Sequence, residues 1–154
     1  MISYADGTRR FNYRIAAIII DDGHLLVHRG DGEPFWAVPG GRAELGEDAA
    51  DTVRREMREE LGEDVRVERL VWLAENFFHY NGHDHHELGL YWLAHLPAGS
   101  PWLDKTRDRT VIDGAALTFR WVPLASLADL PLMPAFLAAG VRALPAGITH
   151  VVVR

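Results

Sequence analysis

The spacing of apolar residues changes along the chain, and the change predicts where extended strands give way to a helix. A β-branched, apolar run at 14–21 ends at the dipeptide Asp22-Gly23, and a second apolar run follows at 24–28. Asp-Gly between two apolar runs is a strong signal for a two-residue turn. These segments are therefore predicted to form a β-hairpin.

From about Asp48 to Leu61 the apolar residues recur at every fourth position. They are Ala49, Val53, Met57 and Leu61. This spacing places them on one face of an α-helix, and Gly62 is a suitable residue to end it. The sequence therefore predicts a helix over 48–61.

The other segments are mostly extended. Strands are expected at 35–39, 65–80, 87–96, 116–122 and 148–153, a polar turn at 81–85, a loop at 99–114, a short helix at 123–130 and a second longer helix at 134–144. The strand at 35–39 leads into Gly40-Gly41, where a tight turn is expected. No repeat or linker divides the chain, which predicts a single domain spanning residues 1–154.

Composition excludes several classes of protein. The chain has 154 residues, of which 48% are hydrophobic and 25% charged, as in an ordinary globular protein. It contains no cysteine, which excludes disulfides, thiolate metal ligands and cysteine nucleophiles. No apolar run approaches about 18 residues and the N-terminus lacks the apolar core of a signal peptide. We therefore expect a cytoplasmic protein without a membrane partner.

The net charge of −6 is concentrated in one segment. Residues 47–64 contain eight acidic residues and three arginines, a local charge of −5, whereas the rest of the chain carries −1. A negative chain is poorly suited to neutralise nucleic-acid phosphates, so no stable nucleic-acid partner is expected. The acidic segment coincides with the predicted helix, and its purpose becomes the main question.

Three carboxylates form a patch on that helix. Each residue advances about 100° around a helix, which places Glu56, Glu59 and Glu60 next to one another beside the apolar face. Such clustering is costly because like charges raise one another's pKa. A divalent cation that prefers oxygen ligands, Mg²⁺ or Mn²⁺, would offset this cost, and Mg²⁺ commonly binds substrate phosphates as well. The patch therefore favours metal-dependent phosphate chemistry over a merely solvated acidic face.

The spacing of these residues resembles the Nudix box, Gly-x5-Glu-x7-Arg-Glu-U-x-Glu-Glu-x-Gly-U, in which U is a bulky aliphatic residue. The matching residues are Gly41, Glu47, Arg55, Glu56, Met57, Glu59, Glu60 and Gly62. Only the last position departs, because Glu63 stands where an aliphatic residue is usual. Seven fixed residues at fixed spacing over positions 41–62 make this a specific signal.

The resemblance implies an α/β fold, an α/β/α sandwich around a mixed β-sheet. It also implies a metal-dependent hydrolase that cleaves the diphosphate linkage of a nucleoside diphosphate derivative by attack of water on phosphorus. Glu56, Glu59 and Glu60 would be the side-chain ligands of Mg²⁺ or Mn²⁺, with the backbone carbonyl of Gly40 as a further ligand. Arg55 and Glu47 would orient these carboxylates by hydrogen bonds.

Three features outside the box are further candidates. Glu87, near the start of a predicted strand, resembles the downstream carboxylate that many Nudix enzymes use as an extra metal ligand or base. Arg29, at the end of the second strand, resembles a basic residue used to bind substrate phosphates. The histidines at 79–86 could bind zinc, but they surround an Asn81-Gly82 turn and are more typical of a polar loop.

Two other functions remain as alternatives. A catalytically silent nucleotide-binding or sensor module would share the fold, but it need not retain every box carboxylate. An isomerase of the same fold is disfavoured because such relatives rely on a cysteine. The substrate itself, whether a nucleotide sugar, a dinucleotide or a nucleoside triphosphate, depends on loops outside the box. A homodimer is possible, with the segment before Phe11 exchanged between subunits.

Overall fold

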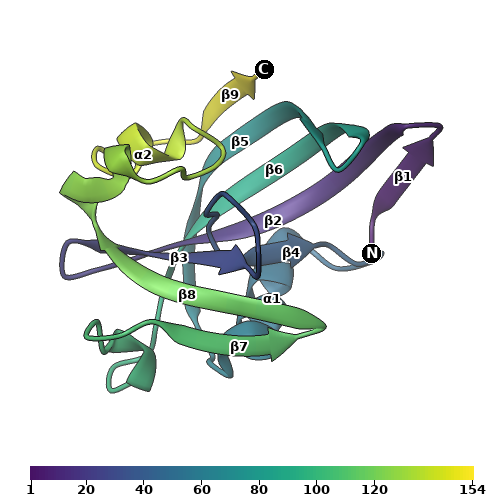
Figure 1. Ribbon diagram of the computed structural model, residues 1–154. Helices are drawn as coiled ribbons and strands as arrows, with labels where there is room; N and C mark the ends of the chain where they lie inside the picture. Colours follow the sequence, from purple (N-terminus) through teal and green to yellow (C-terminus); the bar gives the residue numbers. More distant parts are fainter.

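A computed structural model describes all 154 residues, 1–154, as a large mixed sheet with helices on both faces (Figure 1). The strands are β1 (Ser3–Asp6), β2 (Arg9–Asp21), β3 (His24–Gly30), β4 (Gly40–Arg42), β5 (Arg66–Tyr80), β6 (His83–His95), β7 (Arg109–Asp113), β8 (Ala115–Pro123) and β9 (Thr149–Val153). The helices are α1 (Ala49–Leu61), α2 (Leu137–Gly140) and the 3₁₀ turns η1 (Pro101–Leu103) and η2 (Leu124–Asp129).

The sheet order is β7-β8-β3-β2-β6-β5-β9, and β1 and β4 also pair with β2. Strand β2 runs parallel to β6, and β5 runs parallel to β9, whereas the other pairs are antiparallel. The long strand β2 therefore contacts four other strands. Because of this central position, β2 pairs with both Gly40-Gly41 on β4 and the polar start of β6.

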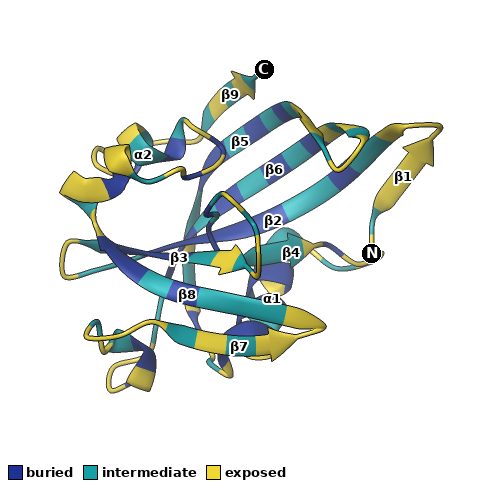
Figure 2. Ribbon diagram, in the orientation of Figure 1, coloured by how far each residue is buried: buried dark blue, intermediate teal, exposed yellow.

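Alternation along β2 divides the core into two layers. Ile15, Ala17 and Ile19 pack with the apolar face of α1, whereas Ala16 and Ile18 pack with residues of η2 and α2 on the other face. Figure 2 shows the corresponding change between buried and less buried positions along the central strands. This arrangement confirms the expected α/β sandwich around a mixed sheet.

The main helix lies where the apolar spacing predicts it. Asp48 caps α1, because its side chain accepts a hydrogen bond from the Asp51 backbone N–H. Gly62 ends the helix in a left-handed conformation, with a φ of 68°. Val53 and Met57 lie on the buried face of the helix, as their spacing of four residues predicts.

The prediction of a loop at 99–114 is wrong in part. It contains the turn η1 and the edge strand β7, which pairs with β8. Only alternate residues of β7 are half-buried, with Val111 packed against the α1 side of the core. Charged residues are typical of a short edge strand, and here they mask the strand pattern.

The prediction of a second longer helix at 134–144 is also wrong. Only α2 is α-helical, and the backbone N–H groups of Arg142 and Ala143 bond three residues back instead of four. Gly140 lies against the indole of Trp72, where a Cβ would be 2.7 Å from a ring carbon. The segment is shaped by this packing contact more than by the helix propensity of its alanines.

Residues 35–39 form no regular strand. Trp36 and Ala37 make isolated bridges, to Leu132 and His28 respectively. Prolines at 34 and 39 flank the segment and lack the N–H group that would extend the pairing. The segment still leads into Gly40-Gly41, but as a connection with local contacts.

The N-terminal segment forms a strand that the apolar pattern did not reveal. Strand β1 pairs with the start of β2 in the same chain, and all four of its residues are exposed. Exchange of this segment between subunits stays a prediction.

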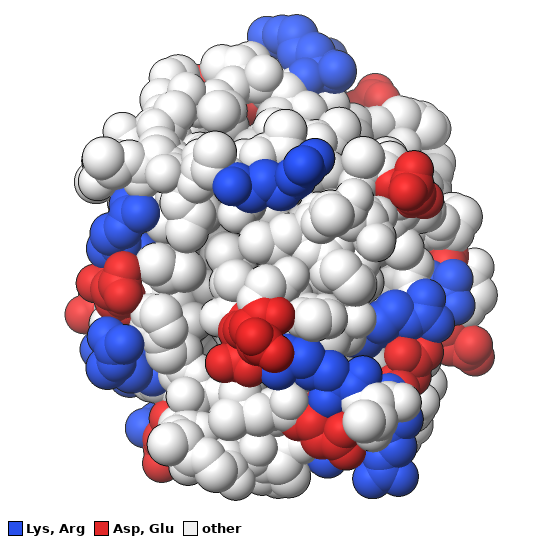
Figure 3. Space-filling model, turned by 90° about the vertical axis from the view of Figure 1, so that its left-hand side faces the viewer, with Lys and Arg blue, Asp and Glu red and all other residues white.

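No helix is long and apolar enough to cross a membrane. On the face drawn in Figure 3, acidic and basic side chains are interspersed and separated by uncharged surface.

Candidate active site

The box glycine Gly41 and the preceding Gly40 lie where side chains would collide. Strand β4 pairs with β2, so Gly40 lies opposite Ala16 and Gly41 opposite Ile15. A Cβ on Gly40 would be 2.3 Å from the Ile15 carbonyl oxygen, and a Cβ on Gly41 would be 2.2 Å from Glu56 Oε1. Glycine is therefore required for β4 to approach both the sheet and the carboxylate of α1.

Arg55 connects three glutamates. Its Nε donates to Glu47 Oε2 at 2.8 Å and its Nη2 donates to Glu47 Oε1 at 3.0 Å. Its Nη1 donates to Glu56 Oε1 at 2.8 Å and lies 3.4 Å from both carboxylate oxygens of Glu59. This guanidinium fixes the positions of the carboxylates and offsets part of their mutual repulsion.

Glu47 is held more firmly than a surface carboxylate. Besides Arg55, it accepts hydrogen bonds from Thr52 Oγ1 at 2.7 Å and from the Glu44 backbone N–H at 3.2 Å. The hydrogen bonds from Arg55, with the smaller contribution of Thr52, lower the pKa of Glu47 to about 2. The residue is therefore ionised at any pH at which the protein is expected to work.

Burial has the opposite effect on Glu56 and Glu60. The carboxylate of Glu60 is almost fully buried, and this burial raises its pKa to about 8. The pKa of Glu56 is also raised by burial, although Arg55 opposes the change. The positive charge of Arg14 lowers both pKa values in part. Perturbed carboxylates of this kind are common at functional sites.

Glu56 and Glu59 of α1 border a cavity of about 460 Å³, whereas the buried Glu60 does not line it. It is lined by Met1, Arg14, Gly41, Arg42, Glu44, Arg55, Glu56, Glu59 and Asp113. The sequence pattern did not identify Arg14, Arg42 or Asp113 as members of this site. The reason is physical, because the pairing of β2 with β4 and the position of β7 bring them there.

The oxygen donors of the box helix are of the type that binds a divalent cation. Glu60 Oε2 is buried and has no hydrogen-bond partner, which is unfavourable unless another group binds it. All the candidate ligands are oxygen atoms, the type that Mg²⁺ prefers. No three carboxylate or imidazole groups lie close enough to hold a metal ion by themselves. Water and substrate phosphates would complete the coordination, as is common for Mg²⁺.

The unusual Glu63 at the end of the box is accommodated by a local polar contact. Glu63 Oε1 accepts a hydrogen bond from Ser100 Oγ at 2.7 Å. The indole of Trp102 covers the helix end, and its Nε1 donates to the Leu61 carbonyl at 2.8 Å. Val65 is buried in the same part of the core. The departure from the box therefore changes the packing at the helix end without altering the carboxylate patch.

Glu87 and Arg29 do not line this cavity. Glu87 is buried on β6, between Asn12 of β2 and Asn76 of β5 in the sheet register. Arg29 is exposed, and its guanidinium lies 4.6 Å from the ring centre of Trp36. Their functions in metal and phosphate binding stay predictions.

The histidines at 79–86 are separated and provide no zinc site. His79 bonds Asp84, and His86 packs on Phe77, whereas His83 and His85 lie together on another part of the surface. The zinc hypothesis is therefore wrong for this arrangement.

The sequence matches the NUDIX domain over residues 10–143, which is most of the chain. The chain belongs to the Nudix family. No curated protein sequence matches it significantly. Four of the matching box residues, Gly41, Arg55, Glu56 and Glu59, line one cavity, which agrees with this membership.

Solved structures support the same fold. A UDP-X diphosphatase has a TM-score of 0.62 and 20% identity, with 96% of this chain and 68% of that chain covered. An ADP-ribose pyrophosphatase from Streptococcus suis has a TM-score of 0.61 and 17% identity, with coverage of 92% and 98%. A MutT NUDIX hydrolase from Burkholderia pseudomallei has a TM-score of 0.54 and 26% identity, with coverage of 90% of each chain. The protein is thus a Nudix hydrolase by family.

Proposed function

We propose that the protein hydrolyses the diphosphate linkage of a nucleoside diphosphate derivative with Mg²⁺ or Mn²⁺. The observation that carries the proposal is the intact carboxylate set of the box helix. Arg55 orients Glu56 and Glu59 beside a cavity, and Glu60 is buried on the same helix with one oxygen unpartnered. Two structural relatives are named for nucleoside diphosphate compounds, a UDP-X diphosphatase and an ADP-ribose pyrophosphatase. Their names support this substrate class without selecting one compound.

Glu56, Glu59 and Glu60, with the Gly40 carbonyl, would hold the cation. When bound there, Mg²⁺ supplies charge neutralisation of the diphosphate, polarisation of a phosphoryl group and a lower pKa for a bound water. The reaction forms a bond between the water oxygen and one phosphorus and breaks the anhydride bond. The two products are phosphate monoesters, and the two protons of the water are released to solvent when both products are dianions.

The protein groups have separate tasks in this proposal. Arg14 and Arg42 line the cavity and present positive charge to phosphate oxygens. Arg55 keeps the carboxylates in place, and Glu47 keeps Arg55 in place through two hydrogen bonds. Arg55 and Glu47 are thus positioning residues, because neither needs to contact the reacting atoms.

An activity screen tests the proposal. The purified protein would be incubated with ADP-ribose, UDP-glucose, diadenosine tetraphosphate and deoxynucleoside triphosphates, with Mg²⁺, Mn²⁺ or EDTA. We expect hydrolysis of at least one class with metal and none with EDTA. Products formed in ¹⁸O-labelled water would identify the attacked phosphorus by mass spectrometry.

The alternative of a silent sensor module predicts a different result. A sensor would bind one of these nucleotides tightly but release no product at any metal concentration. In a sensor, Glu60→Gln would change only the affinity for the nucleotide, because there would be no hydrolysis to lose. Hydrolysis by the wild type that persists unchanged in Glu60→Gln would instead remove Glu60 from the mechanism.

A further inference from the structure

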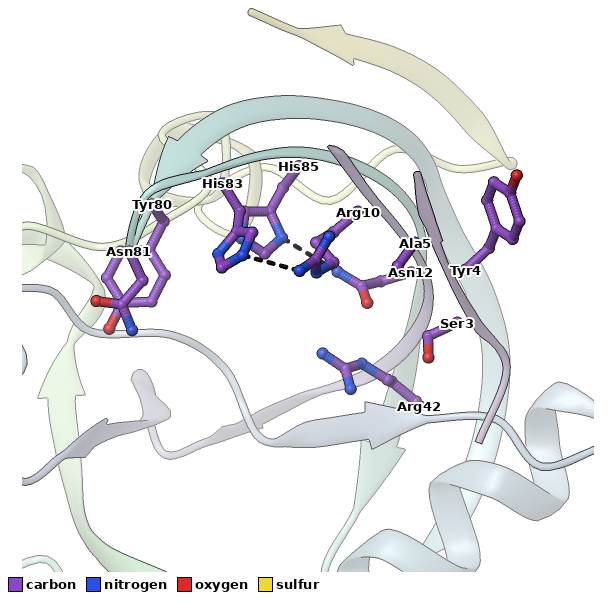
Figure 4. Close-up of a pocket in the computed structure, with 10 residues that line it drawn as sticks. All are labelled: Ser3, Tyr4, Ala5, Arg10, Asn12, Arg42, Tyr80, Asn81, His83 and His85. Atoms are coloured by element: carbon purple, nitrogen blue, oxygen red, sulfur yellow. Dashed lines mark hydrogen bonds between the residues drawn. The ribbon is translucent and has the colours of Figure 1, made fainter. Parts of the chain in front are cut away.

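A second cavity lies beside the first, between the N-terminal strands and the β5–β6 hairpin (Figure 4). It has a volume of about 450 Å³ and its polar lining includes Arg10, Asn12, Arg42, Tyr80, His83 and His85. Of these side chains only Arg42 falls within the Nudix box, at one of its variable positions. The cavity therefore needs an explanation beyond the carboxylate site.

The sheet register brings the basic groups together. Arg10 of β2 lies directly opposite His85 of β6, and His83 is two residues earlier on the same face of β6. Arg42 approaches from β4, and Figure 4 shows its guanidinium pointing into the cavity below the Arg10 and histidine side chains. Three separate strands thus supply basic side chains to one cavity.

Arg10 is fixed in place without a carboxylate partner. Its Nη1 donates to the Gly7 and Arg9 carbonyl oxygens at 2.7 and 2.9 Å, and its Nη2 lies 2.9 Å from His83 Nε2. These contacts order the side chain but do not neutralise its charge. A half-buried arginine held in this way is prepared to bind an anion.

Both imidazoles have one ring nitrogen engaged by a residue of the cavity. A guanidinium has no acceptor, so His83 Nε2 accepts the hydrogen bond from Arg10. Asn12 Nδ2 lies 3.3 Å from His85 Nδ1. These contacts tie the two rings to β2 at the edge of the cavity.

No acidic residue lines this cavity, although the chain carries a net charge of −6. Two acids close to the hairpin already have partners, because Glu33 accepts from the hydroxyl of the cavity residue Tyr80 and Asp84 bonds His79. Two guanidinium groups with nearby imidazoles favour a phosphate, which accepts several charge-assisted hydrogen bonds.

Arg42 lines both this cavity and the cavity bordered by the box glutamates. A ligand bound near the glutamates could therefore extend past Arg42 to Arg10. We propose that the second cavity is a subsite for a further phosphate of the substrate, beyond the diphosphate that is cleaved. This inference rests on the proposed function. It predicts a preference for substrates that have more than two phosphates, or that carry a phosphate on the group that is released.

Diadenosine polyphosphates of increasing length test the subsite. The ratio of kcat/KM for diadenosine tetraphosphate to that for diadenosine diphosphate would be measured for the wild type, Arg10→Gln and Arg9→Gln. Arg9 is exposed and adjacent, so its substitution changes the net charge equally without altering the cavity. We expect Arg10→Gln to lower the ratio about tenfold, since it removes a charge-assisted contact. An equal ratio in all three proteins would overturn the proposal.

A binding measurement separates this proposal from the proposed function. Tripolyphosphate and inorganic phosphate would be titrated calorimetrically into metal-free protein containing EDTA. Arg10→Gln should weaken tripolyphosphate binding about tenfold, Arg9→Gln should leave it within twofold, and Arg10→Lys should recover part of it. Equal binding by Arg10→Gln and Arg9→Gln would overturn the subsite.

Combined results then identify which claim fails. Arg10-dependent binding without hydrolysis of any nucleotide would contradict the proposed function and retain the phosphate site. Arg10-dependent binding of inorganic phosphate without a preference for longer substrates would assign the site to free phosphate and overturn its use by the substrate. Thermal unfolding of each variant would check that the fold is retained.

Discussion

Arg55 and Glu47 form a two-point ion pair between α1 and the segment that precedes it. The Nε–Oε2 and Nη2–Oε1 distances are 2.8 and 3.0 Å, and both side chains are largely shielded from solvent. The same guanidinium donates to the Arg42 carbonyl at 3.0 Å. The pair therefore joins β4, the preceding loop and the helix that carries the carboxylates.

Replacing Glu47 with glutamine should destabilise the protein. Glu47→Gln retains the size of the side chain but removes the charge that Arg55 binds. We expect the free energy of unfolding to fall by about 2 kcal/mol, because the lost hydrogen bonds are charge-assisted. Urea denaturation would measure the change. Asp64→Asn is a suitable control, since its exposed pair with Arg58 should contribute little.

The same pair predicts a loss of stability in acid. The pKa of Glu47 is lowered to about 2 in the folded protein, from an ordinary value of 4.5. A lowered pKa stabilises the folded state above the unfolded-state value, and this stabilisation is lost as the pH falls from about 5 to about 2. The stability difference between wild type and Glu47→Gln should therefore shrink over this range. A difference independent of pH would contradict the assignment.

Two tryptophans of the same core layer provide a test of indole hydrogen bonding. Trp102→Phe should cost about 1 kcal/mol, because it leaves the Leu61 carbonyl without its indole donor. Trp92→Phe should cost less or stabilise the protein, because Trp92 Nε1 is buried without a partner. Chemical denaturation would measure the free energy of unfolding of both variants. Comparable losses would show that the smaller ring volume, and not the indole hydrogen bond, determines the cost.

The sequence predicts α1 and its ends well because short-range signals determine them. The apolar spacing, the Asp48 cap and the left-handed Gly62 all act within a few residues. The helix at 134–144 fails because a contact with distant Trp72 shapes it. Strand β7 was missed because its exposed, charged residues gain their strand conformation from pairing with β8.

A similar distinction applies to the site. The spacing of Glu56, Glu59 and Glu60 along one helix is visible in the sequence. The presence of Arg14 and Asp113 at the same cavity depends on strand pairing, which no local pattern contains. The cavity residues that the motif does not include are therefore brought to the site by the pairing of strands that are distant in the sequence.

Gly41→Ala should disturb the site more than the fold. The added Cβ would be 2.2 Å from Glu56 Oε1, so the carboxylate must move away from β4. We expect at least a tenfold loss of kcat/KM, because a small displacement of a catalytic group is costly. Gly147→Ala is the control, since a Cβ there meets no atom within 4 Å. Wild-type kinetics in Gly41→Ala would contradict the need for close approach.

Glu60→Gln should separate metal binding from stability. The substitution removes a buried carboxylate whose Oε2 has no partner, so the metal-free protein should be at least as stable as the wild type. Mg²⁺ stabilises the folded state in proportion to its binding, and it should raise the Tm of the wild type more than that of Glu60→Gln. Thermal unfolding with EDTA and with increasing Mg²⁺ would measure both effects. Asp51→Asn, an exposed substitution on the same helix, should keep the wild-type response to Mg²⁺. An equal Mg²⁺ response in Glu60→Gln and Asp51→Asn would mean that the cation binds without Glu60, and the ligand set would then have to be reassigned to other carboxylates.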